Sequence, residues 1–144
     1  MFSKSPDERL SIWSDFRKEL ETSSDPLNDL ISFWKDCPFI PYNRKVDPFN
    51  QYNWPTPWEI IVENRYDDFT KALMMSWTLK LTDRFKTSRI EIKTYTDRQK
   101  PRGYNLVFVN DDQVVNYNDN FVVDSISLPE HLILENVLEI QRPR

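Results

Sequence analysis

The sequence lacks most of the residues from which catalytic and metal sites are built. Its 144 residues include one glycine, one cysteine and one histidine. Because Cys37 is the only cysteine, the chain can form neither an internal disulfide nor a cysteine-rich zinc site. Because Gly103 is the only glycine, it cannot form a glycine-rich phosphate loop. His131 follows Glu130 at an expected helical turn, so we interpret it as a surface or packing residue. We therefore predict no metal site and no cofactor.

Long apolar runs are also missing. No stretch approaches the roughly 20 apolar residues that a membrane-spanning helix needs, and residues 1–8 lack the apolar core of a secretory signal. A lone thiol is typical of a reducing compartment, where we expect Cys37 to be a small buried apolar residue. These absences predict a cytoplasmic protein without a membrane partner.

The chain is nevertheless rich in large apolar side chains. With 5 Trp, 6 Tyr and 9 Phe, it does not have the composition of a disordered protein. Its length suits one hydrophobic core. We expect a single domain over residues 1–144, made of N-terminal helices (1–37), a loop rich in proline and aromatic residues (38–55) and a core of helices and strands (56–144).

Capping signals and helical spacing predict four helices, over residues 6–22, 26–37, 56–64 and 68–81. The third begins with a capping box, because Thr56 is followed three residues later by Glu59. Either Asp67 or Asp68 is expected to cap the fourth. Residues 72–79 of that helix are apolar on nearly all sides, so we expect it to be buried.

Beyond Arg89 the apolar pattern changes to the alternation that is typical of strands. Strands are predicted over residues 89–95, 104–109, 113–117, 121–126 and 134–141, with a turn at 110–112. The predicted fold class is therefore α+β, with N-terminal helices packed on a mainly antiparallel sheet.

Residues 38–57 have neither a helical nor an alternating pattern. They contain five of the ten prolines, interleaved with the aromatic residues Phe39, Tyr42, Phe49, Tyr52 and Trp54. Such a segment can line a peptide groove or wrap around a core. We favour the wrapping role.

Thr56, Pro57 and Glu59, followed by Asp67 and Asp68 and then by Thr78, Leu79 and Lys80, resemble the bacterial transglutaminase-like cysteine peptidases. In that family a Thr-Pro-x-Glu helix leads through a glycine turn into an Asp-Cys-Glu-Asp motif, which opens a helix ending near Thr-Leu-Arg. The resemblance covers about residues 54–126 and implies a papain-like core. The family's cysteine falls on Asp68, its catalytic histidine on Tyr104 and its third catalytic residue on Asn116.

These three positions lack the groups that the family's reaction needs. In such enzymes a helix N-terminus and an imidazole stabilise a thiolate, and the imidazole later protonates the leaving group. Asp68 cannot form a thioester, and Tyr104 is not an imidazole. Asn64 and Tyr66 also replace the glycines before the family's cysteine. We therefore predict that the protein is not an enzyme but a non-enzymatic binding or structural module on an inactivated transglutaminase-like fold.

Positive charge is concentrated in one segment of a chain whose net charge is −4. Residues 83–102 hold seven Lys or Arg against three acidic residues, whereas residues 103–141 hold no Lys or Arg. Separated charges of this kind can steer a charged partner. We favour a protein partner or assembly over nucleic acid, and the candidate binding residues are Arg89, Lys93, Arg98, Lys100 and Arg102.

Glu91 and Lys93 support an alternative function as a metal-dependent nuclease. They lie two apart on a predicted strand and so face the same side. They are similar to the Glu-x-Lys strand of such nucleases, in which the acid holds magnesium and the lysine stabilises developing charge. That class also needs an aspartate on the preceding strand, where a helix is predicted here.

A third hypothesis is a structural subunit of a larger particle. The chain is also similar to proteins of T4-like marine bacteriophages, mainly over residues 54–59 and 67–80. This resemblance implies a location in the host cytoplasm or in the virion.

Overall fold

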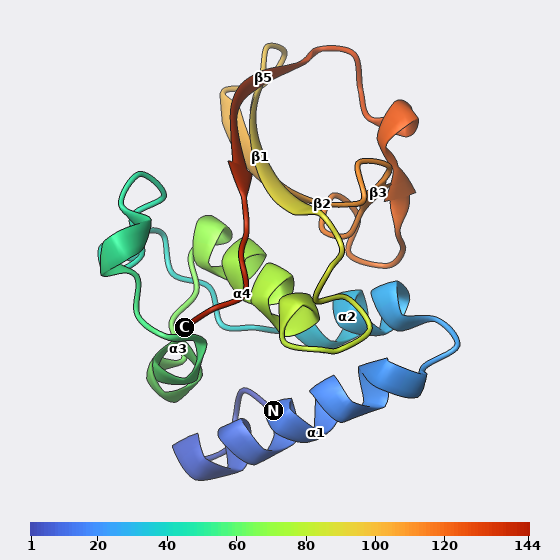
Figure 1. The fold of residues 1–144 in the computed structure, drawn as a ribbon. Coiled ribbons are helices and arrows are strands. Elements are labelled where there is room, and N and C mark those ends of the chain that lie inside the picture. The colour runs from blue at the N-terminus through green and yellow to red at the C-terminus, as the bar shows by residue number, and fades with distance from the viewer.

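The structure is a computed structural model that describes residues 1–144. Four helices pack on a five-stranded antiparallel sheet (Figure 1), so the predicted α+β class is confirmed. The helices are α1 (Pro6–Thr22), α2 (Pro26–Trp34), α3 (Pro57–Glu63) and α4 (Asp68–Lys80). The strands are β1 (Ile90–Asp97), β2 (Arg102–Val109), β3 (Gln113–Val114), β4 (Val123–Asp124) and β5 (Leu132–Glu139). Two 3-10 turns, η1 (Gln51–Asn53) and η2 (Ser125–Ser127), lie in the connections.

The capping residues explain where the helices begin. The Ser5 hydroxyl accepts a hydrogen bond from the Glu8 amide at the start of α1. At α3 both halves of the predicted capping box form, because Thr56 Oγ1 accepts from the Glu59 amide and Glu59 Oε1 accepts from the Thr56 amide. Asn64 ends α3 in the left-handed conformation, with φ of 58°, which asparagine tolerates better than most residues.

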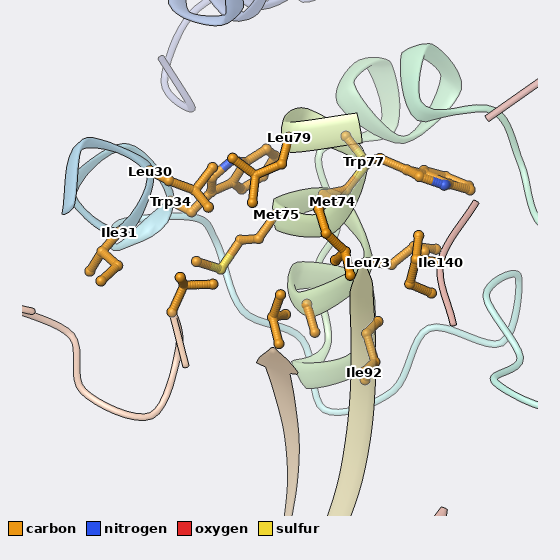
Figure 2. Packing of buried hydrophobic residues seen from close by; sticks show 14 of the residues in the cluster. Leu30, Ile31, Trp34, Leu73, Met74, Met75, Trp77, Leu79, Ile92 and Ile140 are labelled. Atoms are coloured by element: carbon orange, nitrogen blue, oxygen red, sulfur yellow. The ribbon is translucent and has the colours of Figure 1, made fainter. Parts of the chain in front are cut away.

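Helix α4 is the centre of the fold. Eleven of its thirteen residues are buried, so apolar groups must cover it on nearly every side. Figure 1 shows α4 between α1 and the sheet, and Figure 2 shows its side chains between those of α2 and the strand residue Ile92. The buried indole of Trp13 in α1 donates to Thr78 Oγ1 across this packing. None of the four helices has both the length and the apolar character needed to cross a membrane.

The sheet has the strand order β4-β3-β2-β1-β5, and every pairing is antiparallel. Because side chains alternate between faces, Ile92 and Val107 point to α4 and join the main core. Leu106 and Phe108 point to the opposite face, where they form a smaller cluster with Val114. In Figure 1 the end of the sheet that carries the β1–β2 hairpin projects beyond the helices.

The loop over residues 38–55 differs from the prediction. Trp54 wraps the core as expected, because it packs against Phe69 and Trp77 of α4. The other four aromatic residues do not: Phe39, Tyr42, Phe49 and Tyr52 are between 69% and 85% exposed. Val46, not an aromatic ring, is the fully buried residue of this loop. The wrapping role was therefore wrong for most of the aromatic side chains.

Candidate functional site at the start of α4

The first turn of α4 carries two adjacent aspartates with different tasks. Asp67 is the N-cap: its Oδ1 accepts from the Thr70 amide at 2.7 Å, and its Oδ2 accepts from the Asn43 amide at 2.9 Å. Asp68 is the first helical residue and is exposed. Of the two caps that the sequence predicted, Asp67 is the one observed, which leaves the Asp68 carboxylate free to reach the sheet.

Asp68 binds the edge of β2 through Asn105. Its Oδ2 accepts from the Asn105 backbone amide at 3.2 Å and from the Asn105 side-chain amide at 2.9 Å. The Asn105 side-chain oxygen in turn accepts from the Thr94 hydroxyl of β1 at 3.0 Å. One carboxylate therefore joins the start of α4 to the two central strands of the sheet.

Asn116 bonds the same edge of β2 just beyond the end of β3. The Val115 amide donates to Val107 at 3.1 Å, but the chain then turns away from β2. The Asn116 side chain replaces the missing strand: its Oδ1 accepts from the Val107 amide and its Nδ2 donates to the Asn105 carbonyl, both at 2.7 Å. A primary amide can do this because it offers a donor and an acceptor side by side, as a peptide group does.

Asp68, Asn105 and Asn116 thus form one hydrogen-bonded group, which we call the α4–β2 junction. The two carboxamides and the β2 backbone groups between them all have partners. Asn105 and Asn116 are partly buried and Asp68 is exposed. Unpaired polar groups that are partly buried cost free energy. The junction therefore stabilises the part of the β2 edge that β3 does not cover.

Tyr104 does not join this junction. Its side chain lies on the opposite face of β2, where its ring centroid is 6.0 Å from that of Tyr117 and the Arg102 guanidinium lies 4.6 Å from its centre. Asn105, the next residue along β2, is the one whose side chain contacts the start of α4. The sequence prediction missed this because residues 106–109 are apolar on both faces, so the pattern does not fix which side points to the helix.

Neither of the other residues suited to nucleophilic or acid–base chemistry completes the junction. Burial raises the pKa of the Cys37 thiol to about 11, the opposite of what an activated nucleophile needs. Cys37 is half-buried against the main core, and not fully buried as expected. His131 Nε2 lies 3.4 Å from Asp97 Oδ1 beside the β1–β2 hairpin.

The five candidate binding residues lie at three places along β1 and the turn that follows it. Arg89 lies before β1, where its guanidinium is 3.3 Å from Glu91 and 3.8 Å from Asp111. Lys93 is in the middle of β1, with its Nζ 4.3 Å from the centre of the Phe108 ring. The other three, Arg98, Lys100 and Arg102, are exposed at the turn between β1 and β2.

The nuclease hypothesis has little geometric support. Glu91 and Lys93 do face the same side of β1, as predicted. The Glu91 carboxylate, however, is buried and pairs with Arg89. Glu139 lies opposite Glu91 on β5, but no three His, Cys, Asp or Glu side chains gather where they could hold a metal ion.

Comparison with known proteins adds no family to these observations. No protein-family model matches the chain, and no curated protein matches it significantly. The resemblance to transglutaminase-like peptidases therefore rests on the sequence motifs alone.

The junction predicts a stability effect for Asn116. Asn116→Ala leaves the Val107 amide and the Asn105 carbonyl without partners, so we expect the free energy of unfolding to fall by about 1 to 3 kcal/mol. Urea unfolding followed by circular dichroism measures this, with an unchanged slope. Asn136→Ala is the matched control, because Asn136 is exposed on β5 and should change stability by less than about 0.5 kcal/mol. Equal stability of the two variants would contradict the role of Asn116.

Proposed function

We propose that the protein is a non-enzymatic binding or structural module with a protein partner, built on an inactivated transglutaminase-like fold. The α4–β2 junction is the observation that carries this proposal. It joins the start of a buried helix to two neighbouring segments of a sheet through Asp68, Asn105 and Asn116. In the family that the sequence resembles, the positions of Asp68 and Asn116 are those of the nucleophile and of the residue that orients the base.

Asn105 replaces Tyr104 in this comparison. A base must face the helix N-terminus to activate a nucleophile there, and on β2 the residue that does so is Asn105. The correction shifts the comparison by one residue along the strand. The structure brings Asp68 and Asn116 to Asn105 and not to Tyr104, so the base position of the resemblance does not lie at the junction.

The chemistry of the three side chains argues against catalysis. A carboxamide neither takes up nor releases a proton near neutral pH, so Asn105 cannot serve as a general base. The Asp68 carboxylate already accepts two hydrogen bonds from Asn105. A group of this kind stabilises the fold.

The exposed aromatic residues favour binding to a protein. Phe39, Tyr42, Phe49 and Tyr52 come from one loop and are mostly exposed, although aromatic side chains bury large areas when they can. Aromatic residues are enriched at the centres of protein interfaces. The net charge of −4 and the dispersed cations make nucleic acid a weaker alternative.

A thiol introduced by Asp68→Cys tests whether residues 68 and 105 lie as a nucleophile and its base would. In a Cys37→Ala background, Asp68→Cys/Asn105→His should place an imidazole against the new thiol and stabilise its thiolate. We expect iodoacetamide to alkylate it at pH 5 to 6 about tenfold faster than the thiol of Asp68→Cys alone, since one pKa unit corresponds to a tenfold change in thiolate. Asp68→Cys/Tyr104→His is the matched control and should react like the single variant.

Two results would contradict this part of the proposal. Faster alkylation in the Tyr104→His control than in the Asn105→His variant would mean that the residue assignment is wrong. Peptidase or transglutaminase turnover by the unmodified protein, lost in Asp68→Ala, would mean that the protein is an enzyme.

The aromatic loop gives a separate test of binding. Phe49 and Tyr52 are 85% and 83% exposed, so Phe49→Ser/Tyr52→Ser should leave the urea midpoint unchanged. The same double variant should lose proteins that co-purify with the wild type. Trp54→Ser is the contrasting variant, since Trp54 packs on α4 and its loss should lower stability. A double variant that is destabilised would show that these rings support the fold and not a partner.

A further inference from the structure

Strand β5 forms an open edge of the sheet. It has β1 on one side and no strand on the other. The Ile140 amide donates to the Ile90 carbonyl of β1 at 2.8 Å. Backbone groups alternate in direction along an antiparallel strand, so the N–H and C=O groups of Val137 and Glu139 point away from β1. These groups are available to another strand.

This edge carries few of the features that prevent a strand from pairing. Charged side chains (lysine above all), proline, a β-bulge, short length or a covering element usually protects an edge. β5 is eight residues long and contains no Lys, Arg or Pro, and Leu134 and Val137 are 48% and 44% exposed. The opposite edge, β4, has only two residues. The protective features that β5 does have are two exposed glutamates, Glu135 and Glu139, and a bulge in the β1–β5 pairing at Thr94 and Tyr95.

The charge of β5 indicates what can pair with it. Glu135 and Glu139 are exposed on the strand, and the whole segment over residues 103–141 contains no Lys or Arg. Side chains of neighbouring strands interact directly, and like charges that face each other are unfavourable. The edge therefore suits a strand with Lys or Arg among its apolar residues.

We propose that β5 binds an extended basic segment of a partner protein, which adds a sixth strand to the sheet. This inference rests on the proposed function as a protein-binding module and names the surface and the chemistry of the partner. Main-chain hydrogen bonds at Val137 and Glu139 supply affinity, and contacts with Leu134, Glu135 and Glu139 supply selectivity. A second copy of the chain fits less well because it brings another acidic edge, and nucleic acid is repelled by the same carboxylates.

The test uses the full-length protein and a synthetic peptide of seven residues that alternates Lys with Val or Thr. A second peptide with Glu in place of Lys is its control. We expect the basic peptide to slow hydrogen exchange of the Val137 and Glu139 amides about tenfold, because exchange requires these hydrogen bonds to open. The acidic peptide should have no effect. No slowing by the basic peptide at about 1 mM, where even weak complexes form, overturns the proposal.

Variants of β5 separate strand pairing from simple charge attraction. Val137→Pro removes an N–H that points away from β1, which an edge strand tolerates, and it should weaken peptide binding at least about tenfold. Glu135→Lys/Glu139→Lys should weaken it as well. Ile126→Ala is the control, because Ile126 is exposed but lies outside β5, and it should bind like the wild type. Binding that survives Val137→Pro overturns the strand pairing.

The remaining outcomes distinguish this inference from the proposed function. If Val137 and Glu139 become protected as the protein alone is concentrated, the occupant is a second copy and the proposed basic partner is wrong. If the basic peptide fails while Phe49→Ser/Tyr52→Ser still abolishes partner binding, the inference fails and the proposed function stands. If the wild type shows peptidase or transglutaminase turnover, the proposed function fails, whether or not β5 binds the peptide.

Discussion

The burial of α4 is the constraint on which the rest of the structure depends. A helix with apolar residues all round cannot lie on the surface, so α1, α2 and α3 must cover one side and the sheet the other. The central strands then pass close to the first turn of the helix. At this point β3 is too short to cover β2, and the exposed backbone groups of β2 need other partners. Asp68 and Asn116 supply them.

The junction lies where a helix N-terminus faces the edge of a strand. A helix N-terminus that faces a strand edge is a good position for a nucleophile and its base. Here the same geometry is used to satisfy the edge of a sheet. Because the Asn105 and Asn116 carboxamides already have hydrogen-bond partners there, we place the proposed function on exposed elements. These are the aromatic side chains of residues 38–55 and the open edge of β5.

The helices and the general form of the sheet could be predicted because local signals determine them. Thr56 and Glu59 form a capping box, and the change from helical spacing to alternation occurs near Arg89. The details that failed depend on tertiary contacts. Asp67 and Asp68 are both suitable caps, and only the Asn43 and Asn105 contacts distinguish them. The exposure of the loop aromatics and the early end of β3 likewise have no local signal, so Asn105 was not identified as a site residue.

Hydrogen exchange of two β2 amides tests the central claim, that side chains and not a strand satisfy this edge. In the wild type the Asn105 and Val107 amides should exchange slowly. Asp68→Ala should accelerate exchange at Asn105 and not at Val107, and Asn116→Ala should do the reverse, with the Ile92 amide of β1 as an internal reference for global unfolding. If neither variant changes these rates relative to Ile92, the α4–β2 junction does not exist in solution and the account is wrong.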